Sequence, residues 1–461
     1  MKKSILLPLV TLITACLCSA HEKPNVIFIL ADDMGIGDLG CYGGNTIPTP
    51  HIDAIAKNGM RFTNHYSGAP VCGPSRSTFI SGQHTGHAFL RSNPALVAKD
   101  SKFKKLIDPH GRTSDFPVRD SDSSLVMLPE VFQKGGYTTK WIGKWGLGNP
   151  GTPGGPNEVG FDESYGMITH KDAHTYHPKK IWSNDQYIEN VGNQHLHKLF
   201  TANAIDFIER KAESPFFLYL AYQVPHAPHA SIDSLQDEPF TAQHNLTGKT
   251  EVYAAQIAQL DRSIGQIIEK LKAKGIFENT LLIVTSDNGT PYEEESNSLN
   301  SNGEFKGIKR SLYEGGFRAP AVLSWPSQIQ AGSTSDYISA FWDYLPTFAE
   351  LIGQDIPAHT DGVSLMPVIR GEQNIQRPED RPIYVEFICK GHEGRSIRVG
   401  DWKLIQWLKK KNQNTELYNL KDDPSENNDL FSSYAEKAEE LMTLLKNEHQ
   451  FNPHFPLPHV D

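Results

Sequence analysis

Four polar segments that could do chemistry each follow an apolar run typical of a buried strand. They are Asp32-Asp33, Gly143-Lys144, Pro225-His226 and Asp287-Asn288. Because ligand sites of open parallel sheets lie beyond the carboxyl ends of the strands, we expect these groups to converge at one edge. Their carboxylate and amide oxygens suit a hard cation such as calcium or magnesium better than zinc. Either acidic segment alone is as typical of a turn or a helix cap, so the prediction depends on their agreement in position.

The apolar runs indicate the elements that position these groups. They are rich in β-branched and aromatic residues and cover 25–30, 138–142, 216–222 and 281–285. Between them lie stretches with helical periodicity, the clearest from Tyr253 to Leu271. Alternating strands and helices predict an α/β fold, with a large, mostly parallel mixed sheet flanked by helices.

The texture of the sequence changes after about residue 370. Short strand-like runs follow, and then a final helix over 433–448. These runs predict a smaller C-terminal subdomain made of a sheet and one helix. The expected division is therefore a leader at 1–20, a catalytic domain at 21–370 and the subdomain at 371–461.

Composition excludes several classes of protein. The 461 residues contain five cysteines and carry a formal net charge of -10. The chain is too long and too poor in cysteine for a small disulfide scaffold, and its apolar content is too high for long-range disorder. Nucleic acid is not an expected partner, because neutralising phosphates needs a basic face that this composition does not offer.

The first twenty residues have the layout of a secretory signal peptide. Lys2 and Lys3 precede an apolar stretch at 5–17, and small residues precede His21. The stretch is shorter than the roughly 20 residues that span a bilayer. Cleavage after Ala20 and a lipoprotein box ending at Cys16 both fit, so we expect a periplasmic or secreted protein whose only membrane contact is a possible lipid anchor.

Cys72 lies where a helix is expected to begin. Pro74 fits the first turn of a helix, and Arg76 follows one turn later. The amides and dipole of a helix start, together with the arginine, would lower the pKa of a free thiol. A buried free cysteine or half of a disulfide is the alternative interpretation.

The segment from Cys72 to Arg76 resembles the Cys-x-Pro-x-Arg signature of the formylglycine-dependent sulfatases, in the alkaline phosphatase superfamily. The similarity extends over nearly the whole mature chain, through Pro48 to Asp53, Pro225 to Pro228, Lys309 to Arg318 and Trp402 to Leu404. The resemblance implies that a maturation enzyme oxidises Cys72 to formylglycine, whose hydrated aldehyde is the nucleophile.

The resemblance also assigns roles to the polar segments. It implies one divalent cation, usually calcium, held by Asp32, Asp33, Asp287, Asn288 and the modified Cys72. Arg76 would contact the formylglycine. Lys144 and Lys309 would neutralise the sulfate oxygens, and the leaving alcohol would take its proton from His226 or Lys309. Fixed positive charge around an in-line sulfuryl transfer is what this chemistry requires.

One position departs from the family pattern. Many members carry Gly-Lys-Trp-His, whose histidine is the base that collapses the sulfated intermediate, whereas this chain has Gly146 there. A similar Ala-His-x-Tyr segment is typical of the subset with Gly-Lys-Trp-Gly. We therefore hypothesise that His174 takes the vacated space and the role, with His170 and His177 as weaker candidates; plain surface histidines are the alternative.

The leading function is hydrolysis of an O-sulfate ester on a carbohydrate. Trp182, Tyr292 and Trp342 would stack on sugar rings if exposed, although packing in the core is the commoner fate of such residues. A phosphonate monoester or phosphodiester hydrolase of the same superfamily and a non-catalytic surface glycan-binding relative are the alternatives. The sugar and its sulfate position depend on loop shape, which spacing does not encode.

Three residues beyond the cysteine segment are candidates for lining the substrate opening, with plain loop packing as the equal alternative. They are His84, Arg91 and Asn93. The remaining cysteines of the mature chain, Cys41 and Cys389, are far apart in sequence, so we expect two free thiols.

Overall fold

The computed structural model describes residues 23–93, 117–120, 123–170, 172–230, 233–389, 391–409 and 412–461. The predicted leader, with Cys16, lies outside these residues. Within the described residues, no helix combines the length and the apolar character that crossing a membrane requires.

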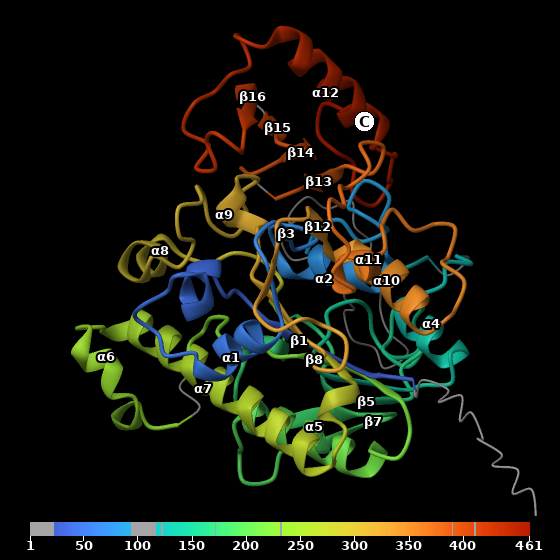
Figure 1. Ribbon diagram of the computed structural model, residues 1–461, viewed down its shortest axis with the longest axis vertical. Coiled ribbons are helices and arrows are strands. Elements are labelled where there is room, and N and C mark those ends of the chain that lie inside the picture. The colour runs from blue at the N-terminus through green and yellow to red at the C-terminus, as the bar shows by residue number, and fades with distance from the viewer. Residues whose placement is uncertain are drawn as a thin grey trace, which may run out of the picture.

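A ten-stranded mixed sheet forms the centre of the molecule (Figure 1). Its order is β11-β2-β10-β9-β1-β8-β4-β5-β6-β7. The five middle strands are parallel: β9 (Thr280–Ser286), β1 (Asn25–Ala31), β8 (Phe216–Ala221), β4 (Thr138–Lys144) and β5 (Glu163–Met167). The outer strands are β10 (Ala321–Ser324), β2 (Met60–Phe62), β11 (Ser333–Ser335), β6 (Lys180–Ser183) and β7 (Gln186–Glu189). The predicted α/β fold is confirmed.

Strand β1 is apolar on both faces because helices cover both faces of the sheet. Phe28 belongs to one hydrophobic cluster and Ile27 and Ile29 to the other, as alternation along a strand requires. The first cluster includes side chains of α2 (Cys72–Ser81), α4 (Leu128–Lys134) and α10 (Tyr344–Leu351). The second includes α1 (Pro50–Asn58), α5 (Leu196–Lys211) and α7 (Gly248–Ala273). Each such buried side chain contributes about 1.5–3 kcal/mol.

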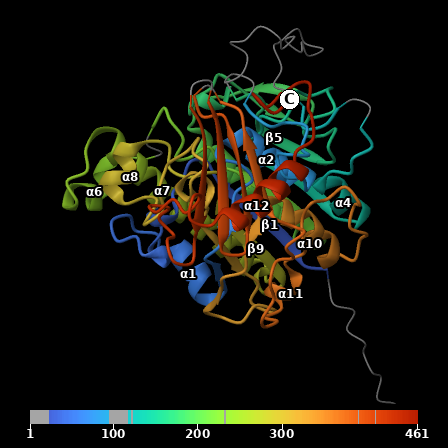
Figure 2. The same ribbon diagram turned by 90° about the horizontal axis from the view of Figure 1, so that it is seen from above.

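The C-terminal part forms a separate four-stranded antiparallel sheet. Its strands are β13 (Ile383–Phe387), β14 (Gly394–Val399), β15 (Trp402–Lys409) and β16 (Asn412–Asn419). Helix α12 (Ala435–Asn447) packs on one face, and Figure 2 looks down on this helix and these strands. The other face shares a hydrophobic cluster with Val71 and Cys72, so the small sheet supports the start of α2.

Short elements complete the described chain. They are β3 (His65–Tyr66), β12 (Ser339–Ala340), α6 (Pro239–Gln243), α8 (Glu293–Leu299), α9 (Glu314–Phe317) and α11 (Met366–Ile369). Cys41, Cys72 and Cys389 are free thiols, which confirms the expectation that Cys41 and Cys389 do not form a disulfide.

Candidate active site

The polar segments meet at the carboxyl edge of the parallel strands. Asp32 follows β1, and its backbone amide donates to Val224 O at 3.1 Å, in the loop after β8. The amide of Asp287, after β9, donates to Ala31 O at 3.1 Å. Lys144 is the last residue of β4. The predicted convergence is therefore what the parallel register produces.

The acidic residues at this edge form a buried, oxygen-rich cluster. Asp32, Asp33, Asp287 and Asn288 are each at most 1% exposed. Asn288 Nδ2 donates to Asp33 Oδ1 at 2.6 Å, and the amide of Asp33 donates to Asp287 Oδ1 at 3.2 Å. Burial and the neighbouring Asp32 carboxylate raise the pKa of Asp287 well above its ordinary value. Carboxylates packed this closely repel each other, and the ion pairs with Arg76, Lys144 and Lys309 offset part of that repulsion.

The cluster fits a divalent cation on the evidence of its unused acceptors. Asp32 Oδ1 and Asn288 Oδ1 are buried and accept no hydrogen bond from any described residue. Asp32, Cys72 and Asp287 bring ligand atoms within 4.8 Å of one another, and so do Asp32, Asp33 and His226. Buried acceptors without donors are costly, so a hard cation bound to these oxygens would satisfy them.

Cys72 begins α2 and faces this cluster. Lys144 Nζ lies 3.4 Å from its Sγ, and Asn93 Nδ2 lies 3.5 Å from it. Burial alone would raise the pKa of the thiol, but the Lys144 ammonium and a hydrogen bond from His170 outweigh it, and the pKa falls well below its ordinary value. The residue at this position is therefore surrounded by groups that favour negative charge.

Arg76 lies on the same face of α2, one turn after Cys72. Its Nε and Nη2 donate to Asp287 Oδ2 at 3.0 and 2.8 Å, and Nη1 donates to Lys144 O at 2.9 Å. The side chain is fully buried. In this arrangement Arg76 fixes Asp287 and the end of β4, and its expected contact with a modified Cys72 stays a prediction.

Lys309 and His226 lie across the cluster from Cys72, beside Asp33. Lys309 Nζ donates to Asp33 Oδ2 at 2.8 Å. His226 Nε2 is 3.6 Å from the same oxygen, while Nδ1 faces Ala227 O. Burial and the Lys309 charge lower the pKa of His226 to about 4. The three predicted cations, Arg76, Lys144 and Lys309, thus each pair with a carboxylate of the acidic cluster.

The expected position of His174 is wrong, because His170 occupies the space at Gly146. A Cβ placed on Gly146 would come within 2.6 Å of His170 Nδ1 and 2.8 Å of its Nε2. The Gly146 amide donates to Ile168 O at 2.9 Å, which brings the next turn of that segment over the glycine. His174 lies further along, exposed, with its ring 5.0 Å from that of His226. His177 is exposed too and bonds Asn193 O.

Of the three candidates for lining the substrate opening, two bond the C-terminal part of the chain and one contacts Cys72. His84 Nε2 bonds Glu448 Oε2 at 3.0 Å, and Arg91 Nη1 bonds Glu386 Oε1 at 2.7 Å, so both attach the segment after α2 to the C-terminal part. Of the three, only Asn93 contacts Cys72, with Nδ2 3.5 Å from Sγ. Its Oδ1 also accepts from the Gly73 amide at 3.0 Å.

The three aromatic candidates for sugar stacking differ in exposure. Trp182 and Trp342 are buried in the core, at 3% and 0% exposure. Tyr292 is 43% exposed and follows the Asp287-Asn288 segment by four residues. Lys249 Nζ lies 6.0 Å from its ring centre. Only Tyr292 of the three is placed to meet a ligand.

Sequence reasoning missed Ser286, the last residue of β9. Its hydroxyl accepts from the Met34 amide at 3.0 Å and donates to Asn288 O at 3.0 Å. The hydroxyl thereby joins the two loops that carry the acidic residues. Its only signal in the sequence is its place next to Asp287.

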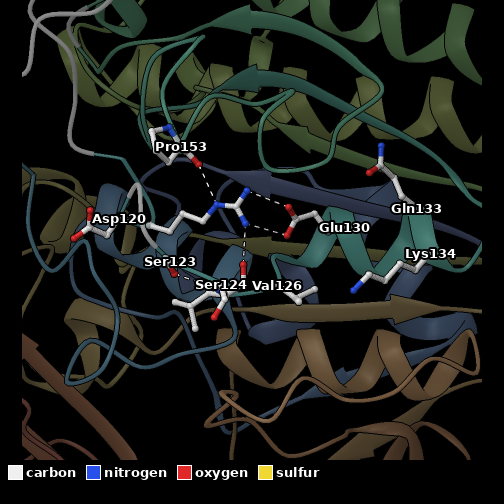
Figure 3. A pocket seen from close by; sticks show the side chains of 10 residues that line it. Asp120, Ser123, Ser124, Val126, Glu130, Gln133, Lys134 and Pro153 are labelled. Carbon is white, nitrogen blue, oxygen red and sulfur yellow. Dashed lines mark hydrogen bonds and ion pairs between the residues drawn. The ribbon is translucent and has the colours of Figure 1, made fainter.

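A cavity of about 450 Å³ lies elsewhere, beside α4 (Figure 3). Its lining includes Arg119, Asp120, Glu130, Gln133 and Lys134, and none of the residues described above. Arg119 is already held by Glu130 at 3.0 Å and by Leu125 O at 2.8 Å. The cavity is therefore no part of the acidic site.

Comparison with known proteins identifies the family. The family model described as "Sulfatase" matches residues 24–354, which is more than half of the chain. The chain belongs to the sulfatase family. A second model, "N-sulphoglucosamine sulphohydrolase, C-terminal", matches residues 303–451. The sulfatase is accordingly a sulfuric ester hydrolase, and the interpretation as a non-catalytic relative is set aside.

Several relatives of this sulfatase have names that include a sugar. The N-acetylgalactosamine-6-sulfatase of Rattus norvegicus is 31% identical over 424 residues, covering 88% of this chain and 75% of the relative. The N-acetylgalactosamine-6-O-sulfatase of Bacteroides thetaiotaomicron is 28% identical and covers 96% and 98%. The solved structure of Ps i-CgsB in complex with k-i-k-neocarrahexaose superposes with a TM-score of 0.78 at 27% identity, covering 95% of this chain and 96% of that one.

Proposed function

We propose that this sulfatase is an exported enzyme that removes an O-sulfate ester from a sulfated carbohydrate, using a formylglycine made from Cys72 and one bound calcium ion. The observation that carries the proposal is that Cys72, Lys144 and the acidic cluster meet at one edge of the sheet. Cys72, the first residue of the Cys-x-Pro-x-Arg segment, begins helix α2, and its Sγ lies 3.4 Å from Lys144 Nζ. Beside it, Asp32 Oδ1 and Asn288 Oδ1 accept no hydrogen bond from the described residues.

Asp32, Asp33, Asp287 and Asn288, with residue 72, would hold the calcium. When bound, the ion neutralises oxygens of the sulfate ester. The all-oxygen protein donors favour calcium or magnesium over zinc. Arg76 keeps Asp287 in place from the side away from the solvent.

The chain's own cations would bind and orient the sulfate. Lys144 on one side and Lys309 on the other add positive charge where the transferred sulfuryl group carries its negative oxygens. Neither ammonium faces bulk water, since the two residues are 1% and 9% exposed, so their charge is little screened. His226 lies beside Lys309, at the place where a proton for the leaving alcohol oxygen is needed.

A carbohydrate substrate is supported by the relatives and by one feature of the surface. Tyr292, four residues after Asn288 in the chain, offers an exposed flat ring with the Lys249 ammonium 6.0 Å from its centre. An aromatic ring packs well on a sugar ring, and a cation would attract the further sulfate groups of a polysaccharide.

Export and maturation complete the proposal. The predicted signal peptide at 1–20 would direct the chain to the periplasm or beyond, with Cys16 as an alternative lipid attachment point. A formylglycine-generating maturation enzyme would act on Cys72 through the segment that ends at Arg76. The maturation enzyme is a processing partner, and the substrate is the sulfated carbohydrate.

The test is production of the chain with and without a maturation enzyme. The mass of the peptide containing Cys72 reports conversion, and sulfate release from a panel of sulfated sugars reports activity. We expect release only from converted protein, and loss of release on chelation with recovery on adding calcium. Full activity of protein with an intact Cys72 thiol would contradict the proposal. Faster turnover of a phosphate ester than of the sulfate ester of the same alcohol would favour the phosphohydrolase alternative.

A further inference from the structure

The feature behind this inference is the histidine ring over Gly146. Gly146 has a φ of 76°, and any Cβ there would overlap the ring of His170. His170 itself is 6% exposed. The ring is therefore packed on the strand end that carries Lys144, with no room for a side chain beneath it.

The same ring reaches the start of α2. A Cβ placed on Gly73 would come within 3.2 Å of His170 Cε1. Gly146 thus makes the space that the ring fills, while at Gly73 a Cβ would first meet Asn93 Oδ1, so the ring borders the start of α2 beside Asn93. The His170 side chain also forms a hydrogen bond with the Cys72 side chain.

Asp32 and Asp287 also lie next to residue 72, but in the proposed function the cation holds their oxygens. Of the other described groups beside residue 72, His170 is the one suited to accept a proton. Lys144 Nζ is an ammonium already held in an ion pair with Asp32 Oδ2 at 2.5 Å. Asn93 carries an amide, which is no base. His174 is exposed and stacks on His226 at an interplanar angle of 15°.

We propose that His170 is the catalytic base that releases sulfate from residue 72, an inference that rests on the proposed function. After sulfuryl transfer, residue 72 carries one sulfated oxygen and one hydroxyl on the same carbon. His170 takes the proton of that hydroxyl. The carbon–oxygen double bond of the aldehyde then forms, the bond from carbon to the sulfated oxygen breaks, and sulfate leaves with the bonding electron pair. Water rehydrates the aldehyde, and His170 gives its proton to solvent.

The experiment compares His170→Ala and His170→Gln with His244→Ala, an exposed histidine elsewhere, in chains matured together with the same enzyme. Rates are divided by the fraction of converted Cys72. We expect the first turnover to release the alcohol at the normal rate in both His170 variants. Steady-state sulfate release should fall on the order of 10²–10⁴-fold. Intact-protein mass should show a covalent sulfate adduct, which His244→Ala should lack.

A double variant tests the position of the ring independently of its loss. His170→Gly removes the ring, and Gly146→His in the same chain returns an imidazole to that space from the neighbouring strand. We expect the pair to regain part of the turnover and to lose the adduct, because the positive φ at position 146 strains the backbone around any side chain. Gly146→His alone should fail, because its Cβ also meets His170.

The outcomes separate this inference from the proposed function. If converted wild-type protein releases no sulfate from any sugar, the proposed function fails. If the wild type is active and His170→Ala turns over normally without an adduct, only the role of His170 fails. An adduct in His174→Ala but not in His170→Ala would likewise overturn it and return the role to His174.

Discussion

Replacing Glu314 by glutamine should weaken the fold in a pH-dependent way. Glu314 starts α9, is fully buried, and accepts from Tyr66 OH at 2.6 Å and from Lys403 Nζ at 2.7 Å. Arg318 Nη1 donates to it at 3.1 Å, and Lys403 also pairs with Glu426 at 2.8 Å. The network joins the segment after Lys309 to strand β15 of the C-terminal sheet, so it helps to hold the Lys309 segment in place.

The magnitude follows from the pKa of Glu314. Burial would raise this pKa, but Lys403, Arg318 and Arg398 together lower it from 4.5 to about 2. A folded-state pKa below the unfolded value means that the carboxylate stabilises the fold above about pH 4.5 and stops doing so as the pH falls through about 2. The 2.5-unit difference corresponds to about 3 kcal/mol at neutral pH, as an order of magnitude for a group in a coupled network.

Urea unfolding of wild type and Glu314→Gln at a series of pH values is the assay. We expect a stability difference of about 3 kcal/mol at pH 7 that falls to about half near pH 3. Glu372→Gln, an exposed carboxylate elsewhere, is the matched control and should change stability by less than about 0.5 kcal/mol at any pH. A Glu314→Gln difference that is the same at pH 7 and pH 3 would refute the reasoning, because the loss would then come from packing.

Three further predictions concern the site. Cys72→Ser should keep the unfolding profile but lose multiple turnover, because a serine ester of sulfate has no second hydroxyl to expel it; unchanged turnover would remove the need for formylglycine. Calcium at 100 times its Kd should stabilise the protein by about 2.7 kcal/mol in a thermal melt, and Asp287→Asn should abolish that shift; a normal shift in the variant would exclude Asp287 as a ligand. His226→Ala should lose far more activity on an alkyl sulfate than on a nitrophenyl sulfate, whose leaving group needs no proton; equal losses would argue against His226 as the acid.

The central strands could be predicted because helices cover both of their faces. Residues 26–30 form an unbroken apolar run, and the observed strand β1 extends one residue further at each end, from Asn25 to Ala31. Short or outer strands carry no such signal. Strand β11 reads Ser333-Thr334-Ser335 and exists only because β2 offers a parallel partner. Its polar side chains need no cover, so neither periodicity nor hydrophobicity marks it.

The acidic residues could be located for the same reason as the strands. Parallel register brings every strand end to one edge, so Asp32 and Asp287 had to be neighbours once β1 and β9 were paired. Ser286 shows the limit of that reasoning. Its hydroxyl joins two loops through Met34 N and Asn288 O, and the direction of a side chain at a strand end depends on contacts that spacing does not contain.

The choice between His170 and His174 depended on one backbone hydrogen bond. Strands β4 and β5 are parallel neighbours. The segments that follow their carboxyl ends stay hydrogen-bonded, because the Gly146 amide donates to Ile168 O. That bond brings His170, two residues further on, over the glycine, while four more residues carry His174 to His226. An imidazole at position 146 and one at position 170 would fill the same volume from adjacent strands. A glycine at 146 is then a requirement of the ring above it, and the departure from Gly-Lys-Trp-His is better explained by a base supplied from the next strand than by a base that has been lost.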